Sequence, residues 1–171
     1  NLLQKRLSED AIELVPFIRS LAYDNTLIRV PGTAMYMTGN LEGVPHAMLH
    51  SLKHYKVLHE RVVLVAVNVL DIPRVANAQR VYVEKLSGQF WRVKVFYGFM
   101  EDPNLPESLG WCAEQGLDFD LMDTSFFLGR ETLIARMNSE MNYWREKIFI
   151  AMFRNASSAA DFFKLPANRV V

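Results

Sequence analysis

An unbroken run of apolar residues, VVLVAV at residues 62–67, constrains the fold of this 171-residue chain more than any other feature. A strand with one face in water alternates polar and apolar side chains, but this run offers apolar side chains to both faces. Both faces must therefore be covered, which is typical of a central strand in a parallel sheet. We expect that strand to span residues 61–70.

The sequence before this run predicts a strand and then a helix. Residues 33–38 (TAMYMT) are rich in strand-forming residues and are followed by a Gly–Asn pair, whereas residues 25–32 read as a connector broken by a Pro–Gly pair. A helix should begin at about Pro45, after which apolar side chains recur at helical spacing. A strand, helix and strand joined in this way form a parallel pair through a right-handed crossover.

The sequence after the run predicts an antiparallel hairpin at one side of the sheet. Residues 80–86 and 91–97 alternate apolar and polar side chains, and Ser87–Gly88 supplies the turn. Further elements are expected at residues 8–21 (a helix kinked or restarted at Pro16, the second part reaching residue 23), 105–115 (helix), 123–128 (a fifth strand), 139–154 (a long helix) and 158–164 (a short helix). The prediction is a single α/β domain over residues 1–171, with a mixed sheet of about five strands flanked by helices.

The amino-acid composition limits the classes of protein to which this chain can belong. Half of the residues are hydrophobic and 19 basic residues balance 19 acidic ones, which indicates a globular chain and argues against a nucleic-acid partner. The single cysteine excludes an internal disulfide and fits a reducing compartment. No apolar run reaches the roughly 18 residues that cross a bilayer, and no signal peptide is visible. Because the sequence starts at Asn1, we expect a piece of a longer protein.

The sequence predicts no catalytic residue, metal site or cofactor. Ser125 lacks the G-x-S-x-G context of a nucleophile, and neither phosphate-binding glycine motif is present. Four residues are nevertheless candidates for ligand binding: Gly32, Thr33, Gly39 and Asn40. Glycine permits close backbone approach, and a loop before a helix N-terminus can hold phosphate, so a nucleotide could bind there; purely structural glycines are the other interpretation.

The predicted helix after Pro45 carries a basic face. His46, His50 and His54 follow one another at four-residue spacing, with Lys53 beside them, on the side opposite the apolar stripe. A shared metal is one interpretation, but no Asp, Glu or Cys joins the stripe. The others are a solvated face and an interaction face for acidic lipid headgroups or a membrane partner. The hydrophobic run of the long helix, NYWREKIFIAMFRN, favours core packing or a homodimer contact.

Five blocks of sequence carry a family resemblance: RVPGTAMYM (29–37), HSLKHYKVLHERVVLV (50–65), FWRVKVFYGF (90–99), DTSFFLGRE (123–131) and PANRVV (166–171). In this order they resemble the C-terminal cytoplasmic domain of the Kup/HAK/KT family of potassium uptake transporters. The resemblance implies a parent protein in the cell inner membrane that moves potassium together with protons, with this domain on the cytoplasmic side. The membrane-spanning part would be its partner, and no transport residue would lie in this chain.

The function predicted on this basis is a non-enzymatic regulatory or dimerisation domain of a potassium transporter. One alternative is a sensor domain for a nucleotide or another small ligand that controls transport. A stand-alone α/β enzyme is the other alternative.

Overall fold

The structure is a computed structural model that describes residues 12–129, 134–136, 144, 146–147 and 156–171. Its strands are β1 (Ile28–Met37), β2 (Val57–Leu70), β3 (Val81–Lys85), β4 (Phe90–Gly98), β5 (Thr124–Leu128) and β6 (Ile134–Arg136). Its α-helices are α2 (Leu14–Leu21), α3 (His46–Tyr55), α4 (Leu105–Gly110) and α6 (Ala156–Phe162). Short 3-10 helices span Asn77–Gln79, Trp111–Gln115, Leu121–Asp123 and Ala167–Arg169.

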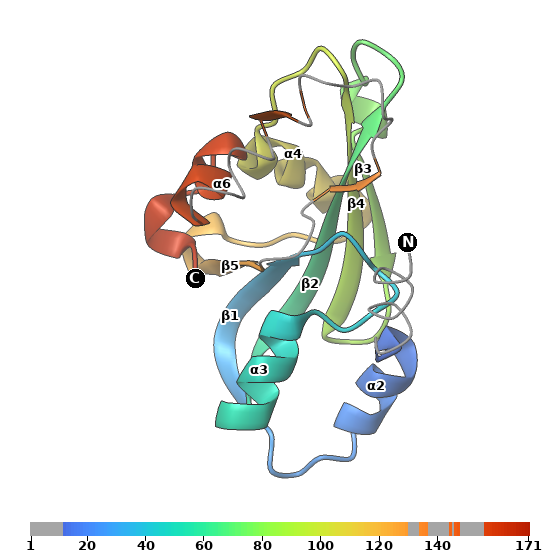
Figure 1. The fold of residues 1–171 in the computed structure, drawn as a ribbon. Helices are drawn as coiled ribbons and strands as arrows, with labels where there is room; N and C mark the ends of the chain where they lie inside the picture. Colours follow the sequence, from blue (N-terminus) through green and yellow to red (C-terminus); the bar gives the residue numbers. More distant parts are fainter. Residues whose placement is uncertain (1–11, 130–133, 137–143, 145, 148–155) are drawn as a thin grey trace, which may run out of the picture.

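The strands form one mixed sheet in the order β3-β4-β2-β1-β5 (Figure 1). The neighbours β4, β2, β1 and β5 run parallel, and β3 pairs with β4 as an antiparallel hairpin at one side. The predicted α/β class, the parallel strand–helix–strand core and the hairpin are therefore confirmed. The structure adds β6, which the sequence did not predict; it pairs with β2 at Val67 and Asn68, beyond the end of β1.

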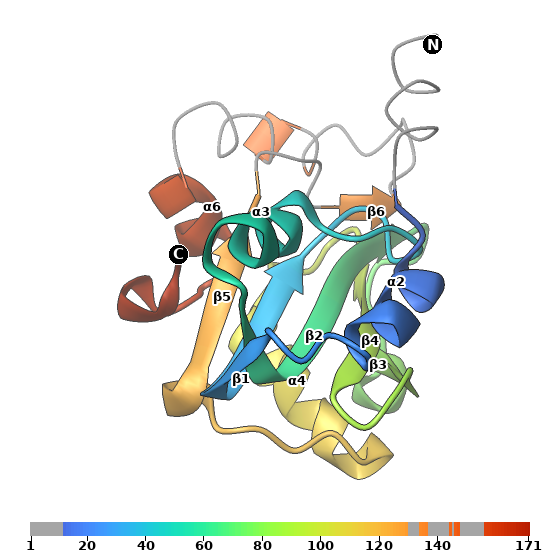
Figure 2. The same ribbon diagram turned by 90° about the horizontal axis from the view of Figure 1, so that it is seen from below.

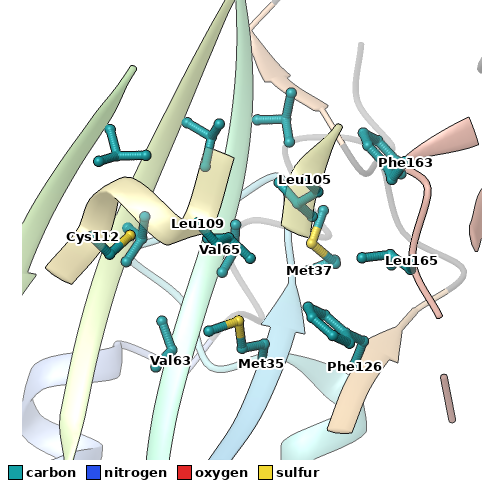
Figure 3. Close-up of a cluster of buried hydrophobic side chains, with 14 of the residues drawn as sticks. Met35, Met37, Val63, Val65, Leu105, Leu109, Cys112, Phe126, Phe163 and Leu165 are labelled. Carbon is teal, nitrogen blue, oxygen red and sulfur yellow. The ribbon is translucent and has the colours of Figure 1, made fainter. Parts of the chain in front are cut away.

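Helices cover both faces of the sheet (Figure 2). Strand β2 sends Val62, Leu64 and Ala66 into the core beneath α2 and α3. Its alternate residues join the second core, which α4, α6 and the C-terminal segment complete (Figure 3). All residues from 62 to 67 are 0% exposed, so the central position that their composition predicts is confirmed.

Strand β1 begins earlier than predicted. It starts at Ile28 and runs through Pro31 and Gly32, so the predicted connector at residues 25–32 is wrong in its second half. A bulge absorbs the Pro–Gly pair, because the register with β2 shifts between Val30 and Thr33. Gly32 has a φ of +99°, and a Cβ there would lie 2.7 Å from the backbone oxygen of Asp123. Only glycine fits this position without strain.

The helices follow the predicted pattern with local differences. Pro16 lies in the first turn of α2, where no amide needs an intrahelical acceptor, so the helix continues through it. The predicted helix at 105–115 changes from α-helix to 3-10 helix after Gly110. Residues 1–11 and most of the predicted helix at 139–154 lie outside the described residues, and the predicted helix at 158–164 is α6.

Both edges of the sheet are covered by short contacts. The Gln115 side chain donates to the Val81 carbonyl at 2.7 Å and accepts from the Val83 amide at 2.9 Å, which occupies the outer edge of β3. At the other edge, the Val171 amide donates to the Phe126 carbonyl of β5 at 2.8 Å. These contacts take up backbone groups that would otherwise attract another strand.

A buried ion pair fixes the loops that follow β2 and β4. Arg80 donates to Glu101 at 2.6 Å, and their side chains are 8% and 12% exposed. The guanidinium also donates to the Val75 and Phe96 carbonyls, while Glu101 accepts from the Val75 and Gly98 amides. Burial raises the pKa of Glu101, but the hydrogen bonds from Arg80 and the two amides outweigh it, so its pKa ends below the ordinary value.

We predict that Glu101→Gln lowers the free energy of unfolding by about 3 kcal/mol at neutral pH, because Arg80 is left buried without a counter-charge. Urea denaturation measures this loss. A group whose pKa is lowered on folding stabilises the protein above its unfolded pKa and loses that contribution as the pH falls, so the difference between variant and wild type should shrink below the ordinary glutamate value of 4.5. The Glu84–Arg92 pair is the control, because the Glu84 side chain is 42% exposed and Arg92 keeps a second partner in Glu42: Glu84→Gln should cost less than about 1 kcal/mol. Equal losses for the two variants would contradict the prediction.

We also predict that Gly32→Ala lowers the free energy of unfolding by more than about 1 kcal/mol, since alanine resists the positive φ and its methyl group meets the Asp123 backbone. Gly88 is the matched control, because a Cβ at that turn meets nothing within 4 Å. Thermal denaturation of both variants tests the pair, and a Gly32→Ala protein as stable as Gly88→Ala would show that the bulge is not constrained.

Candidate functional site

The largest of three described cavities is a groove of about 740 Å³ between α3 and the carboxyl-terminal ends of β1 and β5. It brings together four histidine and lysine side chains predicted to form an interaction face: His46, His50, Lys53 and His54. The floor of the cavity is built from residues of β1 and β5 and the residue after β5: Tyr36, Met37, Phe127, Leu128 and Gly129. We call this cavity the α3–β5 groove.

The floor of the α3–β5 groove is aromatic. Tyr36 of β1 pairs in register with Phe127 of β5, so both side chains leave the same face of the sheet. Their rings stack with centroids 4.6 Å apart and planes 15° from parallel. Burial raises the pKa of Tyr36 to about 12, so the phenol stays neutral near pH 7. The floor therefore offers a flat, uncharged surface.

The rim of the α3–β5 groove is cationic. His50, Lys53 and His54 are exposed, on the side of α3 opposite the fully buried Met48. The rings of His50 and His54 lie 4.5 Å apart, as four-residue spacing on a helix allows. Among the described lining residues there is no carboxylate.

This combination suits an anion with an apolar or planar portion. The rim can pair with phosphate or carboxylate oxygens, while the partly exposed Phe127, backed by the buried Tyr36, can contact the uncharged part. A metal is a poorer fit, because the described residues include no group of three or more His, Cys, Asp or Glu side chains able to hold an ion.

The four predicted ligand-binding residues do not form one site. Gly32 and Thr33 line a separate cavity of about 490 Å³ at the amino-terminal ends of the parallel strands. There the guanidinium of Arg61 lies 5.5 Å from the centre of the Trp91 ring and donates to the Asp118 carbonyl. The arginine is thus engaged by protein groups.

Gly39 and Asn40 lie past the other end of β1. The Asn40 amide donates to the Thr38 hydroxyl at 3.1 Å, and the Asn40 side chain accepts from the Glu42 amide at 3.0 Å. Within the described part of the chain, this turn uses those polar groups internally and is separated from the start of α3 at His46. The predicted phosphate loop at a helix N-terminus is therefore not formed.

Residues with nucleophilic side chains are placed for packing. Cys112 is buried, and burial raises the pKa of its thiol to about 12, so no thiolate forms near pH 7. The Thr124 hydroxyl donates to the Asp120 carbonyl at 2.6 Å.

The described helices are too short or too polar for any of them to cross a bilayer.

Comparison with known proteins identifies the family. Residues 31–171 match the family model described as "K+ potassium transporter C-terminal domain". The chain is 57% identical over 170 residues to "Probable potassium transport system protein Kup 3" of Dechloromonas aromatica, covering 99% of this chain and 27% of that protein. It is 54% identical over 171 residues to "Probable potassium transport system protein Kup" of Azoarcus sp., covering 100% of this chain and 27% of that protein.

The chain thus spans about a quarter of the length of these curated relatives. No solved structure matches it. Both the family model and the relatives agree with the five blocks of sequence that resemble potassium transporters. The chain therefore belongs to the family of Kup potassium transporter C-terminal domains.

Proposed function

We propose that this chain is the cytoplasmic regulatory domain of a potassium uptake transporter in the cell inner membrane, and that it catalyses no reaction. The names of the relatives support the transport context, and their greater length supports a membrane-embedded partner within the same polypeptide. Two further parts of this proposal are symport of potassium with protons, which comes from the family resemblance, and homodimerisation of the domain, which comes from the hydrophobic run NYWREKIFIAMFRN.

The α3–β5 groove is the observation that carries the regulatory role. The described lining of the groove brings His50, Lys53 and His54 together and includes no carboxylate. A phosphate-bearing ligand supplies the opposite charge. If that ligand has different affinities for two states of the domain, its binding shifts the domain toward one of them.

Two sources of phosphate match this chemistry: an anionic lipid headgroup, which would tie the domain to the membrane surface, and a soluble nucleotide. A lipid surface uses the exposed rim of His50, Lys53 and His54, whereas a nucleotide also uses the ring pair beneath it. The two sources differ in their dependence on Phe127.

We predict that at pH 6 the chain binds vesicles containing phosphatidylglycerol, or ATP, about tenfold more tightly in about 50 mM salt than in about 200 mM salt, because salt screens the pairing of the rim with phosphate. Lys53→Gln should weaken binding about fivefold at low salt, and the double change of His50 and His54 to Gln should also weaken it. Flotation measures the vesicle arm and calorimetry the ATP arm.

Arg19→Ala is the matched control, since Arg19 is an exposed cation on the neighbouring α2. It should leave both affinities unchanged. Phe127→Leu should weaken ATP binding only, which separates the two sources. If neither probe binds at pH 6 and low salt, or if Arg19→Ala weakens binding as much as Lys53→Gln, the groove is not the regulatory site.

A further inference from the structure

One end of the sheet projects beyond its neighbours and carries apolar side chains at its tip. Strand β1 ends opposite Val65, whereas β2 continues to Leu70, where it pairs with Gly98 at the end of β4. The loops after β2 and β4 therefore form the far end of a prolonged strand pair (Figure 1).

Three large apolar side chains lie on these two loops, and we call them the apolar tip: Ile72 is 45% exposed, Phe99 40% and Met100 62%. Two backbone hydrogen bonds tie the loops together, from the Phe99 amide to the Ile72 carbonyl at 2.9 Å and from the Met100 amide to the Pro73 carbonyl at 3.0 Å. These bonds hold the three residues on adjoining loops at the same end of the sheet. Clustered exposed apolar side chains mark interaction sites, whereas single ones do not.

The apolar tip is held rigidly from below. The buried pair of Arg80 and Glu101 binds both loops through the Val75 and Gly98 amides. Gly98 packs so closely on the first loop that a Cβ there would lie 2.3 Å from the Pro73 carbonyl oxygen. The Trp144 indole donates to the Phe99 carbonyl at 3.1 Å. A surface fixed in advance loses little conformational entropy when it docks.

Charge favours a protein acceptor over a lipid surface. Among the residues of the two loops, the exposed charged side chains are Asp71, Arg74 and Asp102, which form no basic cluster. Anionic lipid attracts basic clusters, so it does not select this surface. Phenylalanine and methionine are enriched at the centres of protein interfaces.

The length of the relatives indicates which protein covers the tip. The domain occupies 27% of these transporters and its family model is described as C-terminal, so most of a transporter of this family precedes it. The first described residue, Ile12, accepts from the Val44 amide at 2.9 Å, in the connection that follows the carboxyl-terminal end of β1. The apolar tip extends in that same direction along the sheet.

We propose that the apolar tip docks into an apolar recess on the cytoplasmic surface of the membrane-embedded part of the same transporter. The inference rests on the proposed function for the assignment to a transporter, but not on the α3–β5 groove. The acceptor surface is apolar, which complements Ile72, Phe99 and Met100.

Photo-cross-linking in the full-length transporter tests the proposal. With p-benzoylphenylalanine in place of Met100, mass spectrometry should find peptides of the membrane-embedded part of the same polypeptide. The same group in place of Tyr82, which is 55% exposed on β3, should find none. Cross-links from the Met100 position to a second copy of the domain, to lipid, or to nothing would each overturn the proposal.

A substitution tests the proposal through potassium uptake. Met100→Glu should leave the thermal midpoint of the 171-residue chain unchanged, since the side chain is in water, and should change potassium uptake by the full-length transporter about fivefold or more. Tyr82→Glu should change neither. Unaltered uptake by the Met100→Glu transporter would overturn the docking. Absence of phosphate binding at the groove with cross-linking intact would refute the regulatory role of the groove and leave this inference standing.

Discussion

Burial of β2 on both faces is the constraint on which the rest of this domain depends. Residues 62–67 are fully buried, so apolar layers have to exist on each side of the sheet. Helices α2 and α3 supply one layer, and α4, α6 and the C-terminal segment supply the other. Each buried valine or leucine contributes about 1.5–3 kcal/mol as an upper estimate. Because this strand lies in the middle of the sheet, both surfaces of interest are attached to it: the groove through β1 and α3, and the tip through its own far end.

Much of the fold follows from the sequence because local patterns specify it. The apolar run predicts the central strand, alternation predicts the hairpin of β3 and β4, and proline with glycine marks the helix at 105–115. Prediction failed where a tertiary contact overrides a local signal. Pro31 and Gly32 read as a break, yet a bulge against Asp123 carries β1 through them. Strand β6 is only three residues long and pairs with β2 where β1 has ended, so no periodicity could show it.

The sequence predicts the histidine face of the α3–β5 groove but not its aromatic floor. Four-residue spacing places His50 and His54 on one side of a helix, which a sequence reveals directly. The aromatic floor depends on the register that sets Tyr36 beside Phe127, two residues far apart in the chain. Alternation within TAMYMT and DTSFFL indicates which side chains share a face, but not which strands are neighbours. The four candidate ligand-binding residues are separated for a related reason, since Gly32 lies at the bulge within β1 whereas Gly39 follows the end of that strand.

The two edges of the sheet are occupied by other parts of the chain, which limits the surfaces through which the domain can bind a partner. Gln115 occupies the edge of β3 and the C-terminal residues bind β5, so strand addition is blocked at these contacts and interactions have to use side-chain surfaces. The groove and the tip are two such surfaces, joined by the rigid pairing of β1, β2 and β4. Coupling between them requires that a groove ligand have different affinities for the docked and undocked states. Linkage then makes the effect reciprocal: whatever ligand binding does to docking, docking does by the same factor to ligand affinity. Under the proposed function, that reciprocity is sufficient to couple the groove to the membrane-embedded part.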